Sequence, residues 1–222
     1  MSSGKLTLAS LVIGLFGGIG TAAAAPCSTA SLLSYQSAVS CNVGTLNFFG
    51  FSVENFPGPT AQQIAPGEIL VTPIANGFSL SSELPISAPT GELFGLRFLF
   101  GVSAPSLTGA TVELGPNSVS GDGVITAFLD AGSAGNAIAI AFDGFSDAPV
   151  SFTSPPFLSY AAFLELGIDG GTFGSATLGP ILASLTFAQA PTSAIPEPGT
   201  IALSLLAMAA LFTSRRRSIA PV

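Results

Sequence analysis

The chain has 222 residues, of which 12 are acidic, five are basic and none is histidine. Without histidine, Ser-His and Cys-His nucleophile pairs, imidazole metal ligands and histidine general bases are excluded. No phosphate-binding loop, dinucleotide fingerprint or Gly-x-Ser-x-Gly elbow occurs either. We therefore expect no enzymatic activity, no cofactor and no metal, and a glycosidase-type carboxylate pair is the one catalytic arrangement left open.

The first 24 residues have the three parts of a secretory signal peptide. Lys5 supplies the positive charge, residues 6–19 form an apolar stretch, and Ala22 with Ala24 form an A-x-A cleavage site. Gly14, Gly17 and Gly18 in the apolar stretch, and Gly20 directly after it, weaken a permanent helix. We expect residues 1–24 to be recognised by the Sec export machinery and removed, so the chain leaves the cytosol.

Two cysteines, Cys27 and Cys41, lie at the start of the expected mature chain. In an oxidising compartment they predict a structural disulfide that closes a loop of about 15 residues. A redox pair is normally spaced C-x-x-C, and a zinc site needs more ligands. Between the cysteines we expect a short helix capped by Ser28, with Leu32, Tyr35 and Val39 on one face.

Residues 25–190 are expected to form one domain with a large excess of acids. Of the 12 acidic residues of the chain, 11 lie in this domain, because Glu197 lies beyond its C-terminal end. It keeps a single base, Arg97. The resulting charge of −10 repels nucleic acid and anionic lipid, so we exclude both as partners of this domain.

Short apolar and β-branched runs alternate with Gly, Pro, Asn and Asp throughout this domain. This pattern is typical of strands at the spacing found in sandwiches and barrels. We predict an all-β, antiparallel, jelly-roll-like β-sandwich. The expected strands are 45–53, 68–72, 78–84, 93–102, 108–114, 124–130, 137–142, 150–153, 160–168, 175–178 and 182–188.

The expected strand 93–102 has the clearest alternation and contains Arg97. Its buried face is predicted to carry Phe94, Leu96, Phe98, Phe100 and Val102. Arg97 lies on the opposite face and allows two main interpretations. It pairs with an acid across the sheet, or it lies on the solvent face and limits edge pairing. Recognition of an anionic ligand is a third.

Three acidic segments, around Asp122, Asp143 with Asp147, and Asp169, are candidate turns or candidate calcium sites. Calcium requires six to eight oxygen ligands, and none of these segments has the D-x-[DN]-x-[DN]-G spacing. Asp-Gly steps more commonly supply turns that need positive φ. We predict turns, with a weak calcium site as the alternative.

The chain ends in three consecutive segments of different character. Residues 191–200 form a linker that contains Pro196, Glu197 and Pro198, and two prolines keep such a segment extended. Residues 201–214 are predicted to form a transmembrane helix, whose mostly apolar 12-residue stretch 201–212 rises only about 18 Å. Arg215, Arg216 and Arg217 follow in a basic tail, 215–222, expected on the cytoplasmic side.

This tail closely resembles the PEP-CTERM sorting signal of Gram-negative bacteria, in the same order of parts. In that family a membrane protease-transpeptidase, exosortase, is thought to recognise Pro-Glu-Pro and to process proteins bound for the cell surface or extracellular matrix. The resemblance implies the same role for Pro196, Glu197 and Pro198, with Arg215, Arg216 and Arg217 as the transmembrane stop. The alternative is a plain single-span anchor behind a proline linker.

The interior also resembles other proteins that carry this tag. These begin with a Cys, a Leu-x-x-Tyr helix, a second Cys and a Gly-x-Leu-x-Phe strand, and end with a Gly-Gly…Gly-Ser-Ala segment. The resemblance implies a β-sandwich and implies no activity. The matching residues here are Cys27, Leu32, Tyr35, Cys41, Gly44, Leu46, Phe48, Gly170, Gly171, Gly174, Ser175 and Ala176.

From these observations we expect a non-enzymatic, exported protein. It would be anchored transiently in the inner membrane and then reside at the cell surface or outside the cell. The alternative is a carbohydrate-binding module of the extracellular polysaccharide layer. Sugar platforms favour exposed Trp or Tyr, whereas this chain has no Trp and only Tyr35 and Tyr160.

Overall fold

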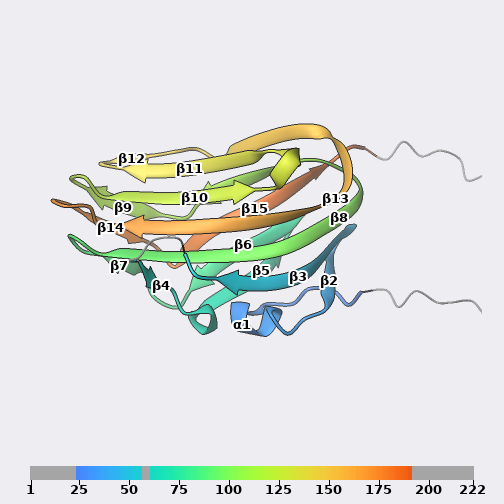
Figure 1. Ribbon diagram of the computed structural model, residues 1–222, viewed down its shortest axis with the longest axis horizontal. Coiled ribbons are helices and arrows are strands. Elements are labelled where there is room, and N and C mark those ends of the chain that lie inside the picture. Colours follow the sequence, from blue (N-terminus) through green and yellow to red (C-terminus); the bar gives the residue numbers. More distant parts are fainter. Residues whose placement is uncertain (1–23, 57–60, 192–222) are drawn as a thin grey trace, which may run out of the picture.

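The computed structural model describes residues 24–56 and 61–191, which form an all-β protein with almost entirely antiparallel pairing, as predicted (Figure 1). The predicted signal peptide up to residue 23 lies outside the described residues. So do the Pro-Glu-Pro motif, the apolar tail helix and the arginine cluster. Within the described ranges, no helix has the length and apolar character needed to cross a bilayer.

The elements follow one another in chain order with short connections. They are β1 (Ala30–Ser31), α1 (Leu32–Tyr35), β2 (Ser40–Val43), β3 (Leu46–Glu54), β4 (Gln62–Gln63), η1 (Pro66–Glu68), β5 (Ile69–Ile74), β6 (Gly77–Ser82), β7 (Ile86–Ala88), β8 (Leu93–Leu114), β9 (Asn117–Ser120), β10 (Val124–Asp130), η2 (Gly132–Ala134), β11 (Asn136–Phe142), β12 (Phe145–Ser146), β13 (Val150–Asp169), β14 (Ser175–Leu178) and β15 (Ile181–Gln189).

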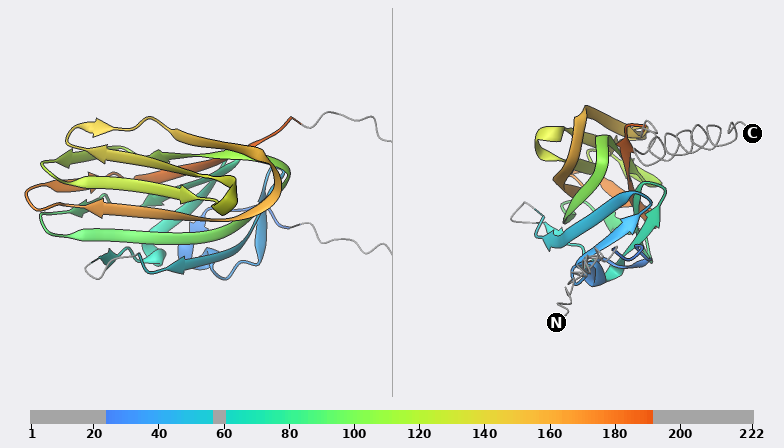
Figure 2. Two further views of the ribbon diagram at one scale, coloured as in Figure 1. Left: turned by 45° about the horizontal axis from the view of Figure 1, so that its top comes forward. Right: turned by 90° about the vertical axis from the view of Figure 1, so that its right-hand side faces the viewer.

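Two long strands, β8 and β13, run antiparallel to each other and belong to both layers of the protein. Residues 97–103 of β8 pair with β3, and residues 107–114 pair with β15. Residues 163–169 of β13 pair with β10, while its first half, up to Phe157, lies beside the second half of β8. Both strands curve round one end of the molecule (Figures 1 and 2). They join a β2–β3–β8–β13–β10–β11–β12 layer to a β1–β5–β6–β15–β8–β13 layer.

The curvature of β8 and β13 explains why the sequence predicts two separate strands for each of these single long strands. Pro105 interrupts the apolar pattern of β8, and Pro155 with Pro156 interrupts that of β13. The pairing register shifts between Thr153 and Ser159, opposite Pro105. Because proline cannot donate to the ladder, it is tolerated at such irregular positions, and the chain bends there without leaving the sheet.

The bounds of two other strands were predicted correctly, whereas the prediction for the N-terminal helix was wrong in its cap and in one residue of its buried face. Strands 124–130 and 175–178 were predicted with the bounds of β10 and β14, whereas short strands such as β2 and β9 were missed. The helix is capped by the Ser31 hydroxyl, which accepts from the Ser34 N–H at 3.2 Å, so the prediction of Ser28 as cap was wrong. Val39, predicted on the buried face, is 89% exposed.

The two layers pack through a cluster of aromatic side chains. Phe48 of β3 lies 4.4 Å from Phe78 of β6 and 5.6 Å from Phe187 of β15, between ring centroids. The predicted inner face of β8 also points into this cluster, through Phe98 and Phe100. Beneath β11 the core is lined by alanines instead, at positions 137, 139 and 141. An aromatic ring buries more apolar surface than an alanine side chain, so each residue on the aromatic side of the core contributes more to stability.

We expect Phe78→Ala to lower the free energy of unfolding by about 3–5 kcal/mol, because it removes a fully buried ring from the middle of this cluster. Urea denaturation measures the change. Phe173→Ala is the matched control: Phe173 is 86% exposed, so its truncation should change stability by less than about 0.5 kcal/mol. Equal effects of the two substitutions would contradict the packing described.

Candidate functional site

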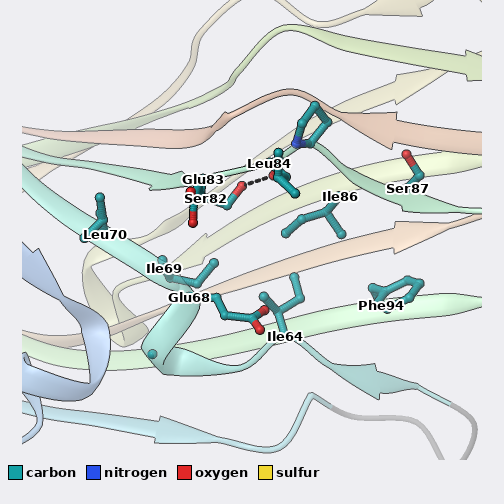
Figure 3. Close-up of a pocket in the computed structure, with 12 residues that line it drawn as sticks. Ile64, Glu68, Ile69, Leu70, Ser82, Glu83, Leu84, Ile86, Ser87 and Phe94 are labelled. Atoms are coloured by element: carbon teal, nitrogen blue, oxygen red, sulfur yellow. Dashed lines mark hydrogen bonds between the residues drawn. The ribbon is translucent and has the colours of Figure 1, made fainter.

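A cleft of about 660 Å³ opens between the η1–β5 segment and the connection from β6 to β7 (Figure 3). Buried Ile64 and Ile69 line it together with Ile86, and Leu84 on its rim is 72% exposed. The Ser82 hydroxyl donates to the Leu84 carbonyl at 2.6 Å, which holds the turn at the rim. The cleft is therefore mostly apolar, with a fixed backbone on one side.

The ionisable side chains of this cleft are two carboxylates, those of Glu68 and Glu83. Both residues are exposed to solvent, and no lysine or arginine lines the cleft. Solvated carboxylates lack the desolvated environment that catalytic acids need at neutral pH. The arrangement offers an acidic rim around an apolar hollow and no acid–base machinery.

A second hollow, of about 440 Å³, lies on the outer face of the layer that contains β3, β8 and β13. We call it the outer groove. Its floor includes Leu99 and Gly101 of β8, and the neighbouring strands contribute Phe49 and Phe163. Ser52 and Asp130 add a hydroxyl and a carboxylate. Few polar groups on an apolar surface are typical of small-molecule and sugar sites.

A β-bulge in β3 directs Phe49 to the groove. Phe48 and Phe51 are both buried, which would be impossible in a regular strand because side chains alternate between faces. Gly50, with φ of 63°, supplies the extra residue, and the pairing with β8 shifts between Phe49 and Ser52. Phe49 is left facing outward at 37% exposure. Its ring lies over Gly101, where a Cβ would collide with it.

Arg97 lies beside this groove and forms an ion-pair triad across three strands. Its Nη1 is 3.4 Å from Glu54 Oε2 on β3, and its Nε is 3.1 Å from Glu165 Oε1 on β13. Its guanidinium carbon lies 4.3 Å from the ring centre of Phe163, a cation–π contact. The prediction of pairing with acids across the sheet is confirmed. The edge-strand interpretation was wrong, because β8 has a neighbour on both sides here.

The acidic segments form turns, as predicted, at the end of the molecule opposite the bend. Gly121, Gly144 and Gly171 all have positive φ. The Asp122 carboxylate accepts from the N–H groups of Phe173 (2.7 Å) and Thr172 (2.9 Å). These two bonds, that of Phe173 first, hold the pKa of Asp122 below its usual value. Asp122 is thus a backbone clamp for the β13–β14 turn.

The other two acidic turns also direct their carboxylates at the backbone. Asp169 Oδ1 accepts from Gly171 N–H at 2.8 Å, and Asp147 Oδ2 accepts from Ile140 N–H at 2.9 Å. Among the described residues, no group of three or more Asp, Glu or Cys side chains gathers where it could hold a metal ion.

The Cys27–Cys41 disulfide is present, as predicted. It ties the start of the described chain to β2 beside α1, where the Tyr35 hydroxyl donates to the Ser28 carbonyl at 2.7 Å. The candidate sorting residues Pro196, Glu197 and Pro198, and the stop residues Arg215, Arg216 and Arg217, lie outside the described residues.

Sequence reasoning missed the outer groove, because its residues come from distant segments. Phe49 and Phe163 are more than a hundred positions apart in the chain, and strand pairing through β8 brings them together. One local signal was available. The run Phe48-Phe49-Gly50-Phe51 breaks the two-residue alternation at a glycine, a pattern typical of a bulge.

Comparison with known proteins identifies no family. No family model matches the chain, and no curated protein matches it. Two solved structures are similar. One is TmCBM61 in complex with β-1,4-galactotriose, at 7% identity and a TM-score of 0.34 over 63% of this chain and 88% of that one. The other is CsCBM6-3 from Clostridium stercorarium with cellobiose, at 15% identity and a TM-score of 0.21 over 77% and 99%. Likenesses this distant assign neither ligand nor activity.

The Asp122 clamp predicts a titration at the β13–β14 turn. Because its folded pKa is lowered from the usual 3.8, ionised Asp122 stabilises the turn above that pH. The contribution is lost as pH falls through the lower folded value. The amide NMR signals of Thr172 and Phe173 should shift with a midpoint below pH 3.8. Asp122→Asn should abolish this titration, whereas Asp143→Asn, in another turn, should leave it unchanged.

The triad predicts unequal effects of two substitutions that remove the same charge. The Glu165 side chain is 20% exposed and that of Glu54 is 52% exposed. We expect Glu165→Gln to cost about 1 kcal/mol of unfolding free energy and Glu54→Gln about 0.5 kcal/mol or less. Urea denaturation at low salt and in 1 M NaCl measures both. The Glu54 effect should be the more strongly screened, and equal costs would contradict the geometry.

Proposed function

We propose that this chain is a non-enzymatic, exported protein of the cell surface or extracellular matrix, with a jelly-roll-like β-sandwich. Export by the Sec machinery would precede transient anchoring in the inner membrane by residues 201–214. Processing by an exosortase-type membrane protease at Pro196-Glu197-Pro198 would follow. The observation that carries the proposal is the sequence of the tail, in which Pro-Glu-Pro, a short apolar segment and an arginine triplet follow one another.

The described domain supports this proposal in two ways. Its disulfide suits an oxidising compartment outside the cytosol. Its two ends also lie together. Asn42 Nδ2 donates to the Ala24 carbonyl at 3.0 Å, the neighbouring Thr45 hydroxyl donates to Gln189 Oε1 at 2.9 Å, and Ala190 N–H donates to the Ser106 carbonyl at 3.0 Å. Ser106 lies in the bend of β8, so an anchored domain would present its opposite end outward.

Replacing Pro196, Glu197 and Pro198 together by alanine should leave the C-terminal tail uncleaved and the protein membrane-bound. The rigid recognition motif is lost, whereas the apolar segment and arginines remain. Deletion of residues 195–222 should remove both processing and surface retention. Cell fractionation and mass spectrometry of the two ends of the mature protein give the readout.

Arg97→Gln is the control, because it removes one positive charge from the folded domain without touching the tail. Unchanged processing in the alanine variant would sink the sorting proposal. If the parent and the alanine variant both retain the tail, it is a plain single-span anchor.

A second candidate function, carbohydrate binding, is favoured by the outer groove. Two phenylalanine rings with an apolar floor and a polar rim are the surface chemistry that sugars contact. The absence of Trp does not remove this possibility, because Phe49 and Phe163 supply the rings. An exported protein with such a groove would meet polysaccharide outside the cell.

A further inference from the structure

We propose that the outer groove binds an uncharged polysaccharide, with a sugar ring lying against Phe49 and Phe163. This inference rests on the carbohydrate-binding function proposed above, to which it adds the site, the contacting residues and the class of ligand. It concerns the outer face of β3, β8 and β13 and not the larger cleft of Figure 3.

The groove offers the two kinds of surface that a sugar ring requires. A pyranose has faces of C–H groups and a rim of hydroxyls, so it needs apolar contact below and polar contact at its edge. Leu99, Gly101 and Ala161 provide the apolar floor, and the rings of Phe49 and Phe163 extend it on either side of β8. The Phe49 ring itself covers Gly101, so a sugar ring would lie against Phe49 and beside the small, exposed Ala161.

Polar groups lie where the hydroxyl rim would be. The Asp130 carboxylate is oriented by one bond, from Gly132 N–H to Oδ1 at 2.6 Å. Its other oxygen can accept from a sugar hydroxyl, and a charged acceptor makes a stronger hydrogen bond than a neutral one. Ser52, across the groove on β3, adds a hydroxyl that can both donate and accept.

The two rings are held before any ligand arrives. Phe49 is directed outward by the Gly50 bulge and lies over Gly101. Phe163 packs against the Arg97 guanidinium and against Phe128, with ring centroids 5.8 Å apart. Arg97 is itself held by Glu54 and Glu165. A site whose rings are already ordered loses little side-chain entropy on binding.

Charge decides the class of polysaccharide. The domain has a net charge of −10, Asp130 lines the groove, and the single arginine is already paired with two acids. Polyuronates and sulfated polymers would be repelled by this field and would find no free cation. An uncharged polysaccharide is not repelled by the negative charge of the domain and needs no cation to bind.

The test is affinity electrophoresis of the full chain in a neutral detergent, through gels that contain dextran, pullulan, hydroxyethylcellulose or alginate. At least one of the three neutral polymers should retard the protein, and alginate should not. Phe49→Ala and Phe163→Ala should each weaken the retardation about tenfold or more, equivalent to losing one aromatic contact. Phe49→Tyr should keep it, because the ring remains.

Phe173→Ala is the matched control, since it truncates an exposed Phe at the opposite end of the molecule and should bind as the parent does. Circular dichroism of every variant separates lost binding from lost folding. Asp130→Asn keeps an acceptor for Gly132 N–H but replaces the charged acceptor with a neutral one, so it should weaken retardation by the neutral polymer, whereas Phe173→Ala should not.

Three outcomes would overturn the inference. If Leu84→Ser on the cleft rim abolishes retardation and Phe49→Ala does not, the sugar site is the cleft, and carbohydrate binding stands without the groove. If alginate retards the protein as strongly as a neutral polymer, the ligand class is wrong. If no polymer retards the protein, both the sugar site in the outer groove and the carbohydrate-binding function are wrong. The export proposal is tested separately by the tail variants.

Discussion

The antiparallel pairing of β8 with β13 is the interaction on which the rest of the structure depends. Each strand contributes one half to each layer, so the backbone hydrogen bonds of this pair also join the two sheets. β3, β10 and β15 all take their places from it. The bend at Pro105 brings the two layers face to face, and the aromatic cluster around Phe48 and Phe78 then fills the space between them. Closely packed rings make such a core intolerant of truncation.

The same strand also organises the outer surface. Alternation places Phe98 and Phe100 in the core and Arg97, Leu99 and Gly101 on the outer face. Because β8 lies between β3 and β13, an arginine at this position has an acid on each side. Two and four positions further along β8, Leu99 and Gly101 form the floor between two phenylalanines. The register of β8 therefore places the ion-pair triad and the groove next to each other on one face. Arg97 of the triad packs against Phe163, which lines the groove.

Local sequence pattern predicted the elements well where one physical rule acted alone. Strict alternation located the inner face of β8, and the three acidic segments located turns with positive φ at Gly121, Gly144 and Gly171. Predictions failed where two rules competed. The predicted strands end at 102 and begin again at 108, although a bent strand with paired neighbours accommodates Pro105 between them. Val39 was placed on a helix face, but the helix ends at Tyr35, before that position is reached. Asp122 was predicted in a turn, and its clamp on another turn 50 residues away had no local signal.

The sequence by itself determined the all-β class, the disulfide and the turns, and the proposed route of export rests on its tail. These properties depend on side-chain period, on residue chemistry and on short motifs, all of which are local. Tertiary structure alone decided that β8 and β13 are continuous, that Arg97 pairs with Glu54 and Glu165, and that Phe49 and Phe163 border one groove. The physical reason is strand pairing: register between segments far apart in the chain sets which side chains meet, and no local pattern encodes that register.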